Sequence, residues 1–242
     1  MGPAFRNLVR GRINEFVDLT LTFLRTRSYR STQYASENVF QGVLEVLLDE
    51  PKFRMGELRL VVDGTKDYGD GRFGFVDIFI SPMNIGGGRN IGGGRERTQG
   101  VVLELKNVTM RGLCSGEKGS WKESYPYNEL EEMARKLDKE DEKVLLARKY
   151  MYKSMDEDTY LSTTVGATMD SAEKQLDKYM RTIALGSLRK SDYTSSGILD
   201  QRIRTYKGCD KLQGHVVMAI GSRRVLVRST ELISTRFEYS CD

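Results

Sequence analysis

The sequence predicts an α/β fold, because amphipathic helices and short apolar strands alternate along its 242 residues. The predicted helices carry apolar residues at helical spacing and cover residues 5–25, 33–48 and 169–185. The predicted strands are rich in Val, Ile and Phe and cover residues 58–63, 73–81, 100–108, 213–220 and 224–229. No break in composition separates these elements, so one domain over residues 1–242 is expected.

The helix at 33–48 has local signals for both of its ends. Its apolar stripe runs from Val39 to Leu48. Ser36 is a suitable residue to begin the helix, and Pro51 lies just beyond the end. These signals favour a helix that packs one face on the rest of the molecule.

A glycine-rich segment separates the strands at 73–81 and 100–108. The unit IGGGR occurs there twice, at 85–89 and 91–95. It lacks the Lys-Ser/Thr pair of a phosphate-binding loop, no helix follows it, and its spacing matches no dinucleotide fingerprint. A flexible hairpin connection is therefore favoured, in which Arg89 and Arg95 could still contact a ligand.

The middle of the chain has weaker patterns. Residues 115–127 are expected to form a loop, and residues 128–153 are charged with a broken helical apolar face. The helix at 169–185 is expected to begin at Asp170 or Ser171. Residues 187–205 are polar and are expected to be partly loop.

Composition and charge restrict the class of protein. The net charge is +4, and six arginines against two acids occupy residues 1–30. Basic segments at both ends could frame an anionic ligand such as nucleic acid, although scattered solubilising charge explains them equally well. No run approaches the roughly 20 apolar residues of a membrane span. Three separated cysteines fit a reducing compartment, so an intracellular location, nucleus or cytoplasm, is expected.

Two predicted strands carry charged residues where a buried strand has none. Asp77 lies within FGFVDIFIS, and Glu104 lies within VVLELKNV. Since neighbouring strands are roughly 5 Å apart, pairing of these strands would bring the two carboxylates together. Without a partner, two buried carboxylates would repel each other and would be costly to bury. A divalent cation such as Mg²⁺ between them would offset both effects. A solvent-facing Glu-x-Lys alternation is the alternative explanation for the second strand.

Lys106 shares a strand face with Glu104, because side chains alternate with period two. Leu105 points the other way, but its backbone carbonyl stays available as a metal ligand. An ammonium beside a metal-bound water can orient that water and stabilise charge in the transition state. This combination suits phosphodiester hydrolysis.

Two helices add candidate side chains. Glu37 lies in the helix at 33–48, one turn before Gln41 and beside the apolar stripe, and could reach the metal through water, unless it is an ordinary solvated position. Gln175 and Tyr179 are four residues apart on the helix at 169–185, so they share a face. An amide and a phenol there could position the lysine or a phosphate, and the alternative is a surface Gln beside a partly buried Tyr.

The order of these motifs resembles the PD-(D/E)XK nuclease superfamily, with Asp77 as the first acid and Glu104-Leu105-Lys106 as the second motif. Gln175 and Tyr179 match the Q-x-x-x-Y of the RecB-like branch, and Glu37 matches its helix glutamate. The segments GRFGFVDIFI, VVLELK and AEKQLDKY are also similar to segments of the nuclease domains of fungal AAA-ATPase-like and related eukaryotic proteins. The proline that names the first motif is absent, since Val76 precedes Asp77.

The resemblance implies a restriction-endonuclease-like core, with a central mixed β-sheet flanked by helices. Residues 1–32 would be a helical extension, 33–185 the motif-bearing core and 186–242 the C-terminal strands. It also implies dependence on Mg²⁺ or Mn²⁺, with metal ligands at Asp77, Glu104, Leu105 and Glu37. The implied catalytic set is Asp77, Glu104, Lys106, Glu37, Gln175 and Tyr179.

Three functions follow as hypotheses. The first is a metal-dependent nuclease acting on nucleic acid, with DNA expected rather than RNA. The second is a module of the same fold that binds nucleic acid without cleaving it. The third is a protein-interaction module, docked to an ATPase or signalling domain in a longer parent protein.

A few further residues complete the sequence analysis. His215 is the single histidine, which excludes multi-histidine metal clusters and favours a structural role. Cys114 has no basic neighbour in sequence that would activate it. Trp121 lies in a loop with lysines and tyrosines, so it could stack on bases or simply anchor that loop.

Overall fold

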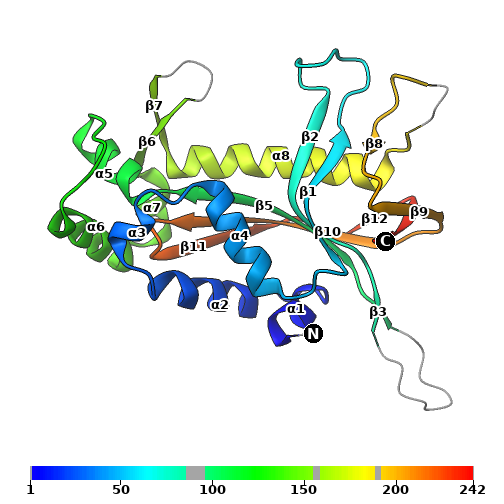
Figure 1. The fold of residues 1–242 in the computed structure, drawn as a ribbon, viewed down its shortest axis with the longest axis horizontal. Helices are drawn as coiled ribbons and strands as arrows, with labels where there is room; N and C mark the ends of the chain where they lie inside the picture. Colours follow the sequence, from blue (N-terminus) through cyan, green and yellow to red (C-terminus); the bar gives the residue numbers. More distant parts are fainter. Residues whose placement is uncertain (1, 86–95, 155–158, 189–191, 242) are drawn as a thin grey trace.

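A computed structural model of the chain describes residues 2–85, 96–154, 159–188 and 192–241. The molecule is an α/β protein in which helices flank a central mixed sheet (Figure 1). The fold class predicted from the sequence is therefore confirmed, and the arrangement is compatible with a restriction-endonuclease-like core. The glycine-rich repeat, with Arg89 and Arg95, lies outside the described residues.

The central sheet contains seven strands within the described residues, in the order β11-β10-β5-β2-β1-β8, with β12 paired to β10. β5 and β10 are parallel, and the other neighbours are antiparallel. The strands are β1 (Arg54–Val61), β2 (Phe73–Ile80), β5 (Gly100–Val108), β8 (Gly197–Ile198), β10 (Lys211–Ile220), β11 (Arg224–Ser229) and β12 (Ile233–Ser234).

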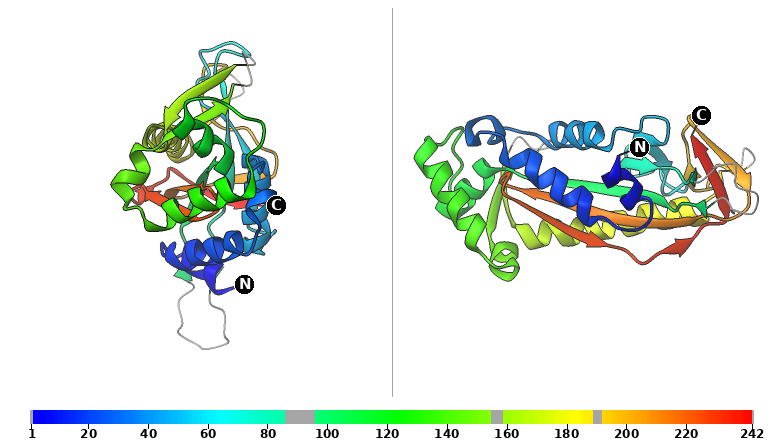
Figure 2. Two further views of the ribbon diagram at one scale, coloured as in Figure 1. Left: turned by 90° about the vertical axis from the view of Figure 1, so that its left-hand side faces the viewer. Right: turned by 90° about the horizontal axis from the view of Figure 1, so that it is seen from below.

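Two hydrophobic cores cover the two faces of this sheet. Alternation along β5 sends Leu103 and Leu105 into one core, where α1, α2 and α4 pack, and Val102 into the other, beneath α8. Figure 2 shows α4 and α8 on opposite sides of the sheet. The helices are α1 (Pro3–Leu8), α2 (Asn14–Arg25), α3 (Tyr29–Thr32), α4 (Glu37–Leu48), α5 (Met110–Lys118), α6 (Tyr127–Lys139), α7 (Glu142–Ala147) and α8 (Val165–Leu185).

Three two-stranded ribbons lie outside the central sheet. β3 (Asn84–Ile85) pairs with β4 (Glu96–Arg97), which agrees with the hairpin expected around the glycine-rich repeat. β6 (Lys149–Lys153) pairs with β7 (Tyr160–Thr164), and β9 (Ile203–Lys207) pairs with β13 (Phe237–Cys241). Among the residues so described, no helix is both long and apolar enough to cross a membrane.

Several sequence-based boundaries were wrong. The helix expected at 5–25 is two helices, because the chain turns at Gly11 with a φ of +81°. The start of the loop expected at 115–127 belongs to α5, and the helical segment expected at 128–153 ends in the strand β6. The last long helix begins at Val165, where the side chain of Thr164 accepts a hydrogen bond from the Ala167 N–H.

Candidate active site

The site forms where β2 separates from β5. The antiparallel pairing of these strands covers Ile78↔Leu103 to Ile80↔Val101. Continued by one step, this register would place Asp77 opposite Glu104. Beyond that point β2 stays paired with β1 (Figure 1). The Asp77 Oδ2 instead accepts a hydrogen bond of 2.6 Å from the Leu105 N–H. The Asp77 side chain thus accepts the hydrogen bond from a backbone N–H of β5 that β2 no longer pairs with.

Glu104 is fully buried beneath α8. Its Oε1 lies 2.9 Å from the Lys106 Nζ as an ion pair, but neither carboxylate oxygen accepts a well-formed hydrogen bond from any group in the described chain. Burial, followed by the nearby charge of Asp77, raises the pKa of Glu104 to about 8, and Lys106 opposes that rise. The carboxylate therefore lacks the compensation that a buried charge normally has.

Asp77 is half-buried on the same face. Burial raises the pKa of Asp77 to about 6, although the hydrogen bond from the Leu105 N–H opposes the rise. Lys106 also opposes it, and Glu37 adds to it. Two carboxyl groups of raised pKa thus lie near one ammonium, Lys106, which directly contacts Glu104 and Glu37, so the cluster is short of positive charge.

Lys106 is held as an ammonium. Its Nζ contacts Glu104 and also lies 3.2 Å from the Glu37 Oε1. Burial works to lower the pKa of Lys106, but the charges of Glu104 and Glu37 outweigh it and raise the pKa. A lysine in this state donates hydrogen bonds and does not accept a proton.

Glu37 is the first residue of α4, directly after Ser36, the residue expected to begin the helix. The Ser36 side chain caps this helix by accepting a hydrogen bond from the Val39 N–H. Glu37 faces Lys106 and is 41% exposed. No three Asp, Glu, His or Cys side chains within the described ranges converge on one point that could hold a metal ion. The structure therefore joins Glu37 to the site through Lys106 and does not gather it with Asp77 and Glu104.

Gln175 and Tyr179 lie on α8, which covers the Glu104 face of the sheet. The Gln175 Nε2 donates a hydrogen bond of 3.1 Å to the Tyr179 hydroxyl. Burial, then the charge of Glu104, raises the pKa of Tyr179. Gly74 permits this placement, since a Cβ there would lie 2.5 Å from a Tyr179 ring carbon.

Two polar residues of the site escaped the sequence analysis. The Gln41 Nε2 donates to the backbone carbonyl of Asp77 at 3.0 Å, and the Asn107 Nδ2 donates to the Ala35 carbonyl at 2.6 Å. Together they fix the start of α4 against the two strands. The sequence offered one indication that these residues belong to the site, which is their position: Gln41 lies one helical turn after Glu37, and Asn107 directly follows Lys106.

The donor set fits Mg²⁺ or Mn²⁺. Both ions take hard oxygen ligands, and Mg²⁺ typically binds one or two carboxylates and retains several waters. Apart from the ion pair with Lys106, no well-formed hydrogen bond reaches the buried Glu104 oxygens within the described chain, and a cation would supply further positive charge. Asp77 and Glu104 would be the side-chain ligands. Leu105 keeps its side chain in the opposite core, as expected, which leaves its carbonyl as the third candidate ligand.

A cleft of about 430 Å³ opens beside the cluster. Glu37, Lys106 and Asn107 form one wall, and Tyr150, Tyr152 and the N-terminal part of α8 form the other. A larger cavity of about 650 Å³ lies at the C-terminal part of α8, next to β11 and β12, and none of the predicted site residues lines it. Of these two cavities, the cleft beside Lys106 is therefore the one that predicted site residues line.

The residues set aside have structural surroundings. His215 is buried, and its Nδ1 lies 2.7 Å from the Ser229 Oγ. Trp121 stacks on Tyr160, and its Nε1 donates to Glu123. These contacts anchor the Trp121 loop to the β6–β7 hairpin, which favours the structural interpretation of Trp121.

The fold and site define an α/β protein with two adjacent acids and a lysine where two strands part. Comparison with known proteins finds no matching family model, no matching curated protein and no matching solved structure.

Proposed function

We propose that this protein is a metal-dependent nuclease of the PD-(D/E)XK kind, which hydrolyses phosphodiester bonds in nucleic acid, with DNA as the expected substrate. The observation that carries the proposal is Glu104, a fully buried carboxyl group beside Asp77 whose ion-pair partner in the described chain is Lys106. Such a group is costly to a folded protein. Its presence is explained if it binds a cation in the working state.

Asp77, Glu104 and the Leu105 carbonyl would hold Mg²⁺ or Mn²⁺. The bound ion would lower the pKa of a coordinated water and polarise the phosphoryl oxygen. Asp77 is held in place by its bond to the Leu105 N–H and by Gln41 on its carbonyl. The geometry of the ligands is therefore set by the two strands and α4 together.

Lys106 would orient the attacking water and stabilise negative charge on the phosphate. Its raised pKa keeps it protonated at neutral pH, so it acts as a hydrogen-bond donor and not as a general base. Glu37 fixes the ammonium from the second side. Tyr179, held by Gln175, would donate its hydroxyl proton toward the acids or the bound phosphate.

The test is cleavage of supercoiled plasmid and of a labelled single strand in Mg²⁺, Mn²⁺ or EDTA. We expect metal-dependent cutting by the wild type and a loss of at least about 100-fold in Glu104→Gln and Lys106→Met, because each removes a group that acts on the reacting atoms. Glu132→Gln and Lys139→Ala, on the exposed side of α6, are the matched controls and keep wild-type rates.

A readout independent of cleavage is thermal stabilisation by metal. Mn²⁺ should raise the melting temperature of the wild type and not that of Glu104→Gln, since a ligand stabilises only the state that binds it. Cutting that persists in Glu104→Gln contradicts the proposal. A gel shift without any cutting would favour the non-cleaving binding module, and the absence of both would favour the protein-interaction module.

A further inference from the structure

The cleft beside Lys106 is built from two unlike walls. The wall opposite Lys106 carries Tyr150 and Tyr152, which are two apart on β6 and therefore share a strand face. Their rings stack with centroids 5.9 Å apart and planes 17° apart. Tyr152 is 38% exposed, so part of its ring is open to the cleft. The cleft lies within the usual size of a small-molecule site, about 300 to 1,000 Å³.

The tyrosine wall is held firmly by α5. Two glycines on that helix, Gly112 and Gly116, allow β6 to approach. A Cβ at Gly112 would lie 2.2 Å from a Tyr150 ring carbon, and one at Gly116 would lie 2.3 Å from the Lys149 carbonyl oxygen. At the far end of the hairpin, Glu123 accepts hydrogen bonds from Trp121 and from the Tyr160 hydroxyl. A wall fixed at both ends is a preorganised stacking surface.

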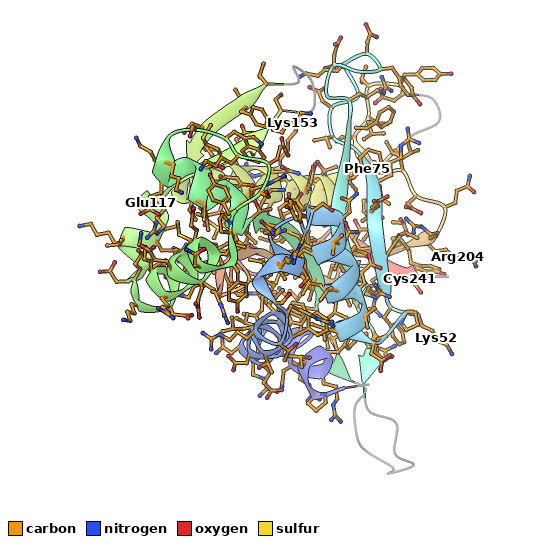
Figure 3. All side chains as sticks on the ribbon, turned by 60° about the vertical axis from the view of Figure 1, so that its left-hand side comes forward. Lys52, Phe75, Glu117, Lys153, Arg204 and Cys241 are labelled. Atoms are coloured by element: carbon orange, nitrogen blue, oxygen red, sulfur yellow. The ribbon has the colours of Figure 1, made fainter. Side chains whose placement is uncertain are left out.

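A polar stripe leads from this cleft to the acids. Thr168, Ser171, Gln175 and Tyr179 follow one another at spacings of three or four residues, so they share one face of α8. Thr168 and Ser171 line the cleft, and Tyr179 lies against Gly74 of β2, the strand that carries Asp77. α8 contacts both β7 and β1. These strands belong to the pairs β6–β7 and β1–β2, which Figure 3 marks with Lys153 on β6 and Phe75 on β2.

We propose that this cleft is a nucleotide subsite for an unpaired strand: one base stacks on Tyr152, and the adjoining sugar-phosphate chain follows Ser171 and Gln175 to the acids. An aromatic side chain can stack only on a base face that is free of its neighbours. Bases within a duplex have no such face, so the site selects single strands or unpaired ends. This inference rests on the proposed function and names its substrate class.

The test compares binding of one labelled 20-nucleotide sequence as single-stranded DNA, single-stranded RNA and blunt duplex DNA, by fluorescence polarisation. Glu104→Gln in EDTA is the parent protein, so that nothing is cut. We expect the parent to bind single strands more tightly than the duplex. Adding Tyr152→Ala should raise the single-strand Kd about 5- to 150-fold, the range measured for loss of one stacked base, and Tyr152→Phe should restore it.

Two further variants keep the test decisive. Ser171→Phe fills the cleft from α8, and should weaken single-strand binding even if Tyr152→Ala folds poorly. Tyr193→Ala is the control, since Tyr193 is 83% exposed and lies outside the cleft. Unchanged single-strand binding in both Tyr152→Ala and Ser171→Phe, or an equal loss for the duplex, overturns the subsite.

Cleavage assays then separate this inference from the proposed function. Metal-dependent cutting with the same single-strand KM in wild type and Tyr152→Ala leaves the nuclease standing and removes the subsite. Tyr152-dependent binding of single strands by a protein that cuts nothing keeps the subsite and removes the nuclease. Neither binding nor cutting removes both.

Discussion

Lys106 is one ammonium that serves two directly contacting carboxylates, Glu104 and Glu37, with Asp77 close by. An ion pair in the interior stabilises a protein only when its remaining polar atoms are satisfied. Apart from the contact with Lys106, no well-formed hydrogen bond reaches the oxygens of Glu104 within the described chain. The residues of this cluster therefore contribute unequally to stability, and that inequality can be measured.

We expect Glu104→Gln to leave the free energy of unfolding at pH 7 unchanged or to raise it by about 1 kcal/mol, because an amide is neutral without binding a proton, whereas the raised pKa of Glu104 shows that burial disfavours its charged form. Lys106→Met should lower it by about 3 kcal/mol, since it leaves a buried acid without its partner. Urea unfolding of both variants and of the double variant checks this. A loss in Glu104→Gln as large as that in Lys106→Met would mean that the pair is chiefly structural.

His215 gives the molecule a dependence on acid. Burial lowers the pKa of His215 from 6.5 to about 4 in the folded state. Between pH 6.5 and 4 the imidazole binds a proton in the unfolded state but not in the folded state. The free energy of unfolding is therefore unaffected by His215 above pH 6.5 and decreases as the pH falls towards 4. We expect the wild type to lose about 3 kcal/mol more than His215→Asn between pH 7.5 and pH 4.

Thermal or urea unfolding across that pH range measures the difference. Ser229→Ala is the matched control, because it removes the hydrogen-bond partner and keeps the imidazole. It should show the wild-type pH dependence. A His215→Asn protein with the same acid sensitivity as the wild type would assign that sensitivity to other groups.

At the scale of the element, α5 and β6 show how glycine can mislead sequence analysis. Gly112 and Gly116 weaken the helical pattern of residues 110–118, and in the structure they are the points where β6 packs against that helix. Each glycine lowers the stability of the helix by about 1 kcal/mol relative to alanine. Glycine is nevertheless required at both positions, because a larger residue would collide with β6.

Gly112→Ala and Gly42→Ala form a matched pair of substitutions within helices. A Cβ at Gly112 would overlap Tyr150, so we expect a loss of about 1 to 3 kcal/mol in stability. Gly42 in α4 has nothing within 4 Å of such an atom, and Gly42→Ala should add about 0.5 to 1 kcal/mol. Melting temperatures of the two variants should move in opposite directions. A shift in the same direction would contradict the packing assigned to α5.

The strands and helices that carry the candidate residues could be predicted because each has a strong local pattern. The apolar runs around Asp77 and Glu104 and the capped stripe after Ser36 became β2, β5 and α4. The register that aligns the two acids depends on pairing between distant segments, which no local pattern shows. The strand at 149–153 was missed because its two tyrosines follow a charged helical segment, where a period of two is hard to separate from a broken helix.

For the whole molecule, one sheet serves two cores. Leu103 of β5 lies in the core under α4, and Leu176 of α8 lies in the core on the opposite face. β5 contributes alternate residues to both. The loss of either core should therefore remove the support of the other, so the chain is expected to unfold as one unit.

We predict that unfolding followed by Trp121 fluorescence and by far-UV circular dichroism gives coincident transitions. Leu103→Ala and Leu176→Ala should each lower both transitions together, by about 2 to 5 kcal/mol, because each deletes a fully buried side chain. Separate transitions in either variant would show that the two faces are independently stable.

The bond from the Leu105 N–H to Asp77 has a consequence for how variants of this protein are interpreted and for how its sequence can drift. Asp77 closes the end of a strand pair, and under the proposed function it would also supply an acid to the site, so two separate requirements would then preserve it. A relative that lost its chemistry would still need a short side-chain acceptor at this position, and Asn or Ser would serve. The presence of Asp77 alone would then not indicate activity. The Glu104 side chain makes no hydrogen bond to β2 within the described chain, so such a relative would be expected to replace Glu104 before Asp77.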